Sequence, residues 1–66
     1  MKNRIRVARA EVRMTQQQLA EAIGVSRQTI NAIESGKFVP STVLALKMAQ
    51  IFEKPVEGIF MLDDED

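Results

Sequence analysis

The sequence predicts an all-α domain of five short helices, and two kinds of observation indicate this fold class. Apolar residues recur every three or four positions along most of the 66-residue chain, the spacing that places them on one face of a helix. Residues that favour helix starts precede several of these segments, and Gly24 and Gly36 follow two of them. The length allows one domain.

The composition excludes several kinds of protein. Histidine and cysteine are absent, so we expect no disulfide and no metal site built on those residues. A chain of this length has no room for a separate ligand domain, so no cofactor and no small-molecule ligand are expected. The acidic residues form no recognisable catalytic set, so an enzyme is not expected. No apolar run approaches the ~18 residues of a membrane span, and no signal peptide is recognisable. These features predict a cytoplasmic protein without a membrane partner.

The charges are unevenly distributed although the net charge is zero. Residues 1–13 contain five basic residues and one acidic residue, a net charge of +4. Residues 41–66 have a net charge of −4, which the last four residues account for. We expect residues 63–66 to be an acidic disordered tail and residues 1–62 to be the folded domain, whose basic side can face phosphate.

The first two helices are expected at about 3–12 and 16–23. Asn3 is the expected cap of the first, and Ile5, Ala8 and Val12 fall on one side of it. Thr15 precedes the second helix, with Gln18 placed to complete a capping box. The second helix has an apolar face of Leu19, Ala20 and Ile23 and ends at Gly24.

The third helix is expected at about 27–35, capped by Ser26. Ile30 and Ile33 define its core side, and Gln28, Asn31, Ala32 and Ser35 lie opposite. Two short helices joined at a glycine form a helix-turn-helix, the motif that inserts its second helix into the DNA major groove. An ordinary helical hairpin explains the isoleucines equally well, but it does not require Ser-Arg-Gln-Thr at a helix start.

The fourth helix is expected at 42–52 after Ser41, and a short fifth at 56–59 after Pro55. Apolar residues cover most of the fourth helix, so it is either central or covered by a partner on its second side. The apolar run that follows predicts a dimer interface, with C-terminal strands pairing across the dimer; the alternative is that it completes the monomer core. The predicted interface residues are Ile59, Phe60, Met61 and Leu62.

Three segments carry a resemblance to a known family. "VSRQTINAIESGK", "PSTVLALKMAQIF" and "PVEGIF" resemble the recognition helix and the fourth and fifth helices of the phage-repressor and Cro-like (Xre) helix-turn-helix proteins. The likeness extends from about Asn3 to Phe60, and is greatest to small stand-alone members typified by the cytolysin repressor. It implies a five-helix lambda-repressor-like DNA-binding domain.

The resemblance also implies roles for individual residues. Arg27 is expected to pair with guanine and Gln28 with adenine at the entering end of the recognition helix. Asn31 is a base reader or a phosphate contact, and Lys37 lies over the DNA backbone. The full set of implied DNA contacts is Gln16, Gln17, Ser26, Arg27, Gln28, Thr29, Asn31 and Lys37.

Two further residues match a family ion pair, and two depart from the family pattern. Arg9 and Glu34 are expected to join the first and third helices; the alternative is two unconnected surface charges. Arg13 stands where a glycine is common, so the turn there must close without it. Gly58 stands where an acidic residue is common, which weakens the fifth helix.

Together these features predict a homodimeric transcriptional regulator, most simply a repressor, whose partner is double-stranded DNA. An antitoxin that binds a toxin protein and its own promoter would have the same domain, as would a controller of a restriction–modification system. A helical protein-interaction module that never meets DNA is an alternative of a different class.

Overall fold

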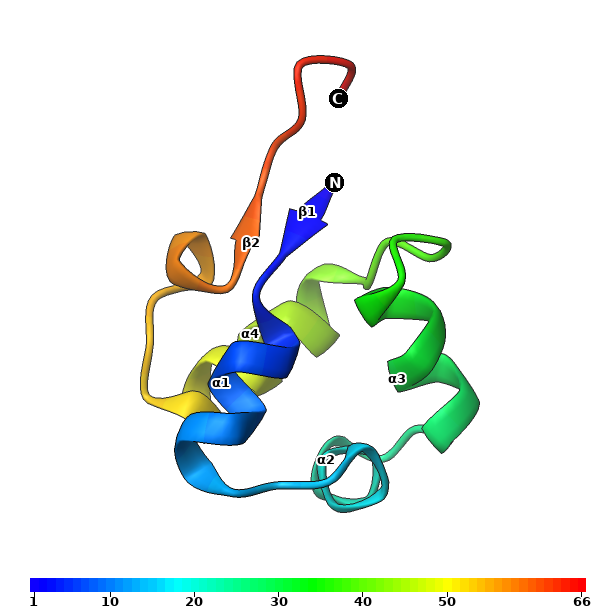
Figure 1. Ribbon diagram of the computed structural model, residues 1–66, viewed down its shortest axis with the longest axis vertical. Coiled ribbons are helices and arrows are strands. Elements are labelled where there is room, and N and C mark those ends of the chain that lie inside the picture. The colour runs from blue at the N-terminus through cyan, green and yellow to red at the C-terminus, as the bar shows by residue number, and fades with distance from the viewer.

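The computed structural model describes residues 1–66, folded as four α-helices, one short 3-10 turn and two short strands (Figure 1). In chain order these are β1 (Lys2–Asn3), α1 (Ile5–Val12), α2 (Gln16–Ile23), α3 (Arg27–Glu34), α4 (Thr42–Phe52), η1 (Val56–Gly58) and β2 (Phe60–Met61). None of the helices combines the length and the apolar character needed to cross a bilayer.

The predicted helix starts at Thr15, Ser26 and Ser41 are confirmed. Thr15 Oγ1 accepts the Gln18 N–H at 3.0 Å, and Gln18 Oε1 accepts the Thr15 N–H at 2.9 Å, which completes the capping box. Ser26 Oγ and Ser41 Oγ each accept the N–H three residues on, at 3.1 and 3.2 Å. These side chains satisfy backbone donors that have no partner within a helix.

The prediction of a fifth helix is wrong, because the segment after Pro55 is a three-residue 3-10 turn, Val56–Gly58. Pro55 is itself in extended conformation, and the backbone enters β2 two residues after Gly58. A helix of fewer than two turns gains too few hydrogen bonds to offset the cost of starting it. The fold therefore has four α-helices, in keeping with the all-α class.

The first helix begins later than expected because Asn3 belongs to a strand. Asn3 pairs with Phe60 and Lys2 with Met61 in an antiparallel two-stranded sheet. Asn3 Oδ1 still accepts the Ile5 N–H at 3.2 Å, so its side chain supports the start of α1 from outside the helix. The predicted strand after Ile59 is present, but its partner is the same chain's N-terminal segment.

The sheet holds the two ends of the chain beside each other (Figure 1). The Arg4 N–H donates to the Ile59 carbonyl at 2.7 Å, just beyond the strand pair. In the acidic segment 63–66, the carboxylates of Asp63 and Asp66 lie 3.0 and 3.3 Å from the Met1 amino nitrogen. These two contacts connect the acidic segment to the basic front of the chain.

A single core of eleven buried apolar residues fills the space between the helices. Ile59 and Phe60 belong to it, with 0% and 7% of their surface exposed, so half of the predicted interface run is buried within the monomer. Val12 lies outside the core, against expectation, because α1 ends there and the chain turns away. The core residues are Ile5, Ala8, Leu19, Ala20, Ile23, Ile30, Ile33, Met48, Phe52, Ile59 and Phe60.

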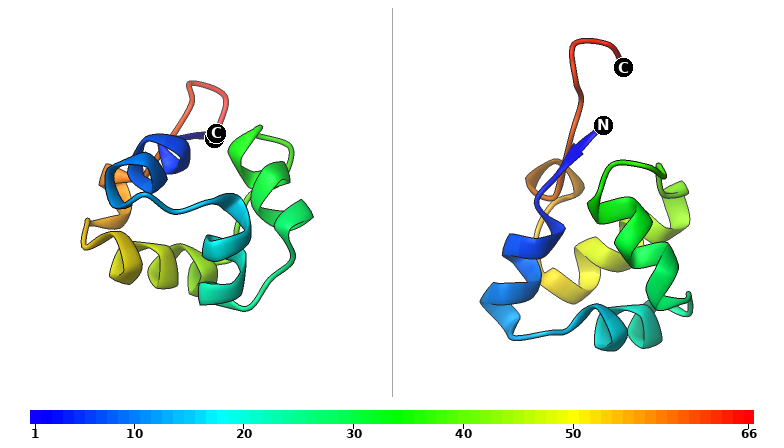
Figure 2. Two further views of the ribbon diagram at one scale, coloured as in Figure 1. Left: turned by 60° about the horizontal axis from the view of Figure 1, so that its bottom comes forward. Right: turned by 45° about the vertical axis from the view of Figure 1, so that its right-hand side comes forward.

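The helix α4 buries only one of its two apolar sides. Met48 and Phe52 face the core, whereas Val43 and Leu46 remain 61% and 52% exposed. The left view of Figure 2 shows α3, in green, at one edge of the molecule, and its Arg27, Gln28 and Asn31 are exposed. The fold thus leaves two uncovered surfaces, one along α3 and one along α4.

Candidate nucleic-acid interface

The turn between α2 and α3 sets the direction of α3. Gly24 has φ +77°, a left-handed conformation that glycine adopts without steric cost. The N–H groups of Gly24 and Val25 both donate to the Ala20 carbonyl, at 2.9 and 3.0 Å. Ala20 itself is fully buried, and its small side chain lets the two helices approach closely.

The two sides of α3 differ sharply in character. Ile30 and Ile33 are 0% and 1% exposed and anchor the helix to the core. On the opposite side, Arg27, Gln28 and Asn31 are exposed and line a hollow of ≈ 240 Å³ that contains no apolar side chain. The predicted separation of a core side and a polar side is therefore confirmed. Such a surface offers hydrogen-bond donors and acceptors to whatever lies against it.

A second hollow, of ≈ 270 Å³, lies beside the first and was not predicted from the sequence. Gln28, Thr29, Ala32 and Phe38 line it, so Gln28 separates a polar hollow from a partly apolar one. Phe38 is 49% exposed although it is aromatic. Phe38 was not among the residues singled out from the sequence; an aromatic residue four positions after the end of a polar helix was the available signal.

The loop after α3 is attached to the helix end. The N–H groups of Lys37 and Phe38 both donate to the Ala32 carbonyl, at 2.9 and 3.2 Å. Gly36, with φ +81°, makes the reversal that this arrangement needs. Lys37 is exposed at this end of α3, whereas Arg27 is at its start.

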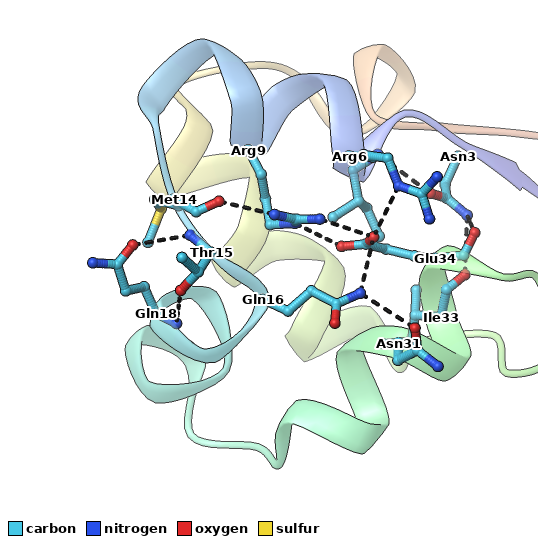
Figure 3. Close-up of polar contacts among 11 residues, drawn as sticks. Asn3, Arg6, Arg9, Met14, Thr15, Gln16, Gln18, Asn31, Ile33 and Glu34 are labelled. Carbon is cyan, nitrogen blue, oxygen red and sulfur yellow. Dashed lines mark hydrogen bonds and ion pairs between the residues drawn. The ribbon is translucent and has the colours of Figure 1, made fainter.

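The predicted ion pair between Arg9 and Glu34 is present and joins α1 to α3 (Figure 3). Arg9 Nε and Nη2 donate to the two carboxylate oxygens of Glu34, at 2.7 and 3.1 Å. Arg9 Nη1 also donates to the Met14 carbonyl at 2.9 Å. Only 2% of the Glu34 side chain is exposed, so this bidentate pair is largely shielded from water.

Two more side chains approach the same carboxylate. Gln16 Nε2 donates to Glu34 Oε1 at 3.3 Å, and the exposed Arg6 Nε lies 3.7 Å from that oxygen. Burial raises the pKa of the Glu34 carboxyl, but the hydrogen bonds from Arg9 and Gln16 and the charges of Arg9 and Arg6 outweigh it and hold the pKa below its usual value. Glu34 is therefore ionised and connects α1, α2 and α3.

The two glutamines that open α2 were expected to contact DNA, but their side chains form hydrogen bonds within the protein. Gln16 Nε2 donates within the protein, to Glu34 and to Asn31 Oδ1 at 3.3 Å, and Gln17 Nε2 donates to Glu21 at 3.0 Å. Their backbone N–H groups, in contrast, have no acceptor in the chain. These are the donors that a helix start presents to an anion.

The remaining predicted site residues are used partly for structure. Ser26 Oγ caps α3 and lies 3.0 Å from Thr29 Oγ1, so both hydroxyls have a partner. The structure gathers Arg27, Gln28 and Asn31 at one hollow and leaves Gln17 and Lys37 apart from it. The acidic side chains form no group able to hold a metal ion.

A short turn between two packed helices, the second with an exposed polar side, defines a helix-turn-helix protein. The sequence model described as "Helix-turn-helix" matches residues 5–59, and the chain belongs to this Xre-like helix-turn-helix family.

Relatives from distant organisms match over the whole chain. The uncharacterized HTH-type transcriptional regulator YgzD of Bacillus subtilis is 44% identical over 66 residues, covering 100% of both chains. A similarly named regulator of Methanocaldococcus jannaschii is 48% identical over 66 residues, again covering 100% of both. A crystal structure from Bacteroides fragilis, described as a candidate DNA-binding protein, has a TM-score of 0.79 and 34% identity, covering 88% of this chain and 94% of that one.

Proposed function

We propose that the protein is a sequence-specific DNA-binding transcriptional regulator, a homodimeric repressor that inserts α3 into the major groove. The observation that carries this proposal is the exposed side of α3, where Arg27, Gln28 and Asn31 gather while two isoleucines fix the helix from behind. The relatives are named as transcriptional regulators, which supports the same class.

The donors and acceptors on α3 suit base edges in the major groove. Arg27 offers a planar pair of N–H donors for guanine O6 and N7, and the Gln28 amide offers a donor and an acceptor for adenine. The free N–H groups at the start of α2 and the Lys37 ammonium would meet phosphates on either side. In this proposal Gln16 contributes through its backbone, while its side chain orients Asn31.

A second copy would extend the contact along the duplex. The eight residues of α3 span roughly 12 Å, so one helix reads only a few base pairs. Two copies would place their α3 helices ~34 Å apart in successive major grooves. Binding at such a site would exclude polymerase by occupation.

The proposed dimer surface is the uncovered side of α4 with the residues around it. Val39, Val43 and Leu46 are all more than half exposed, and Val39 and Leu46 line an apolar groove of ≈ 210 Å³. Phe60 lines the same groove, and the residues that follow it in the chain, the half-buried Met61 and Leu62 at 77% exposure, are included in the proposed surface. Ile59 and Phe60 support it from the core.

The uncovered apolar side of α4 also favours a second candidate, an antitoxin or interaction module that binds another protein there. Selection of duplexes from a random pool by the purified protein separates the regulator from an interaction module that never meets DNA. An antitoxin also binds its own promoter, so a toxin partner bound on α4 would be what distinguishes it from the regulator. The regulator proposal predicts an enriched motif with two half-sites and an affinity that falls steeply with salt, by ~0.9 in the log–log slope per phosphate contact. If no duplex is enriched even at low ionic strength, the proposal is wrong and the interaction module is favoured.

A further inference from the structure

The exposed side of α3 has two chemically different compartments that share Gln28. One is the polar hollow formed with Arg27 and Asn31, and the other contains Ala32 and Phe38. We propose that Ala32 and Phe38 form a site for the 5-methyl group of a thymine, which makes them specificity-determining residues. This inference rests on the proposed function, because it requires α3 to lie in the major groove.

The chemistry of the groove identifies the occupant. Among the four bases only thymine presents a methyl group in the major groove, and apolar side chains contact it there. An amide such as that of Gln28 pairs with adenine N6 and N7 in the same groove. The arrangement of Gln28 next to Ala32 and Phe38 therefore matches an adenine with a thymine at the same or the neighbouring base pair.

The protein's own hydrogen bonds hold the backbone of the site in place. The backbone N–H of Phe38 is bonded to the Ala32 carbonyl at 3.2 Å, which holds the residue beside the last turn of α3. The neighbouring N–H of Lys37 bonds to the same oxygen. A site held in place in this way loses little conformational freedom on binding.

The exposure of Phe38 also supports a methyl-binding site. About half of this residue, 49%, is exposed to solvent. Burying aromatic surface is favourable, and a thymine methyl placed in the hollow of ≈ 270 Å³ would cover part of the ring. The same contact would exclude the polar amino group that cytosine presents at the neighbouring ring position.

Replacement of single thymines by deoxyuridine tests the proposal, since this change removes only the methyl group. The duplex is the motif enriched from the random pool, and affinity is measured at one salt concentration for each thymine position. We expect one thymine per half-site at which uracil weakens binding by about three- to tenfold, the range for one buried methyl group. At thymines that the protein does not contact, replacement by uracil should leave the affinity unchanged.

Two variants assign the methyl contact to these residues. In Phe38→Ala and Ala32→Ser the ratio of thymine to uracil affinity at that position should fall toward one. Lys37→Ala is the matched control, which should weaken binding to both duplexes and keep their ratio. Circular dichroism confirms that each variant folds, and the exposure of Phe38 makes that outcome expected.

The results separate this proposal from the one on which it rests. If the protein enriches a duplex but uracil is tolerated at every thymine, the methyl site is wrong and the regulator proposal stands. An unchanged thymine-to-uracil ratio in Phe38→Ala, with uniformly weaker binding, would show that the ring contacts the sugar–phosphate backbone instead. Failure to bind any duplex would overturn both.

Discussion

Arg9 and Glu34 lie 25 positions apart in the sequence, and their side chains form two hydrogen bonds, of 2.7 and 3.1 Å, across the junction of α1 and α3. The carboxylate is shielded from water and is also bonded to Gln16 of α2. One side chain therefore relates the direction of α3 to both helices that precede it. This pair positions the proposed reading helix without touching its exposed side.

Replacement of Glu34 by glutamine should be strongly destabilising. Glu34→Gln keeps the shape but leaves the Arg9 guanidinium without a counter-charge in a shielded place, which costs about 3 to 5 kcal/mol in comparable pairs. Urea denaturation followed by circular dichroism measures the change in the free energy of unfolding. Glu21→Gln, on the exposed side of α2, is the control and should change it by no more than about 0.5 kcal/mol. Equal stability of the two variants would show that the pair is energetically neutral.

The same carboxyl should make the protein sensitive to acid. Its pKa in the folded state is below the ordinary value of 4.5, so between these two values the unfolded chain binds a proton that the folded chain does not. The free energy of unfolding should therefore decrease as the pH falls below about 4.5, and be fully regained above it. Urea denaturation at several pH values in this range measures the effect. The free energy of unfolding should depend less steeply on pH in Glu34→Gln than in the unmodified protein. Parallel curves would assign the acid sensitivity to other carboxyls.

A glycine at position 13 should stabilise the fold. Arg13 has φ +57° at the end of α1, a left-handed conformation that costs a residue with a Cβ atom about 1 kcal/mol. Arg13→Gly should raise the free energy of unfolding by about 0.5 kcal/mol, because the added freedom of the unfolded chain offsets part of the gain. Arg13→Ala retains the strain and is the control. A glycine variant less stable than the alanine variant would contradict this account.

Two basic residues at opposite ends of α3 should affect DNA binding differently. Arg27→Ala should lose about 1–3 kcal/mol and relax the base preference at one position in each half-site. Lys37→Ala should weaken binding evenly over all sequences and reduce the salt slope by about 0.9. Titration of both variants against matched and mismatched duplexes distinguishes the two effects. A uniform loss for Arg27→Ala would place that residue on phosphate only.

Introduction of a charge on the uncovered side of α4 should separate the proposed dimer. Leu46→Lys should shift sedimentation toward monomer, and should weaken binding to a full operator more than binding to a single half-site. Val7→Lys is the control, because Val7 is equally exposed, at 49%, but lines a different hollow on α1. A Leu46→Lys protein that remains dimeric would move the interface elsewhere.

The local features of the fold were predictable because their causes are local. The caps at Thr15, Ser26 and Ser41 follow from a hydroxyl placed three residues before a free N–H, and Gly24 follows from the need for a left-handed residue. The buried isoleucines of α3 follow from their spacing.

Features that join distant segments were not predictable in this way. The pairing of 2–3 with 60–61 depends on where four helices bring the two segments, which no short pattern records. The expected fifth helix failed because Pro55 and the adjoining β2 leave it only three residues. In the candidate site, the polar residues of α3 were predicted by periodicity, whereas Phe38 joins them through a loop geometry that spacing does not specify.

The hydrogen bonds from Lys37 and Phe38 to Ala32 make the stretch 27–38 a self-contained unit, because its loop takes its position from its own helix. The inward isoleucines and the Glu34 carboxylate connect that unit to the rest of the protein. Asn31 and the Ile33 carbonyl add two hydrogen bonds, from the Gln16 and Asn3 side chains. A transplant of the whole stretch between relatives that share those anchors would carry the base preference with it. Exchange of the helix alone would break the unit and leave the preference incomplete.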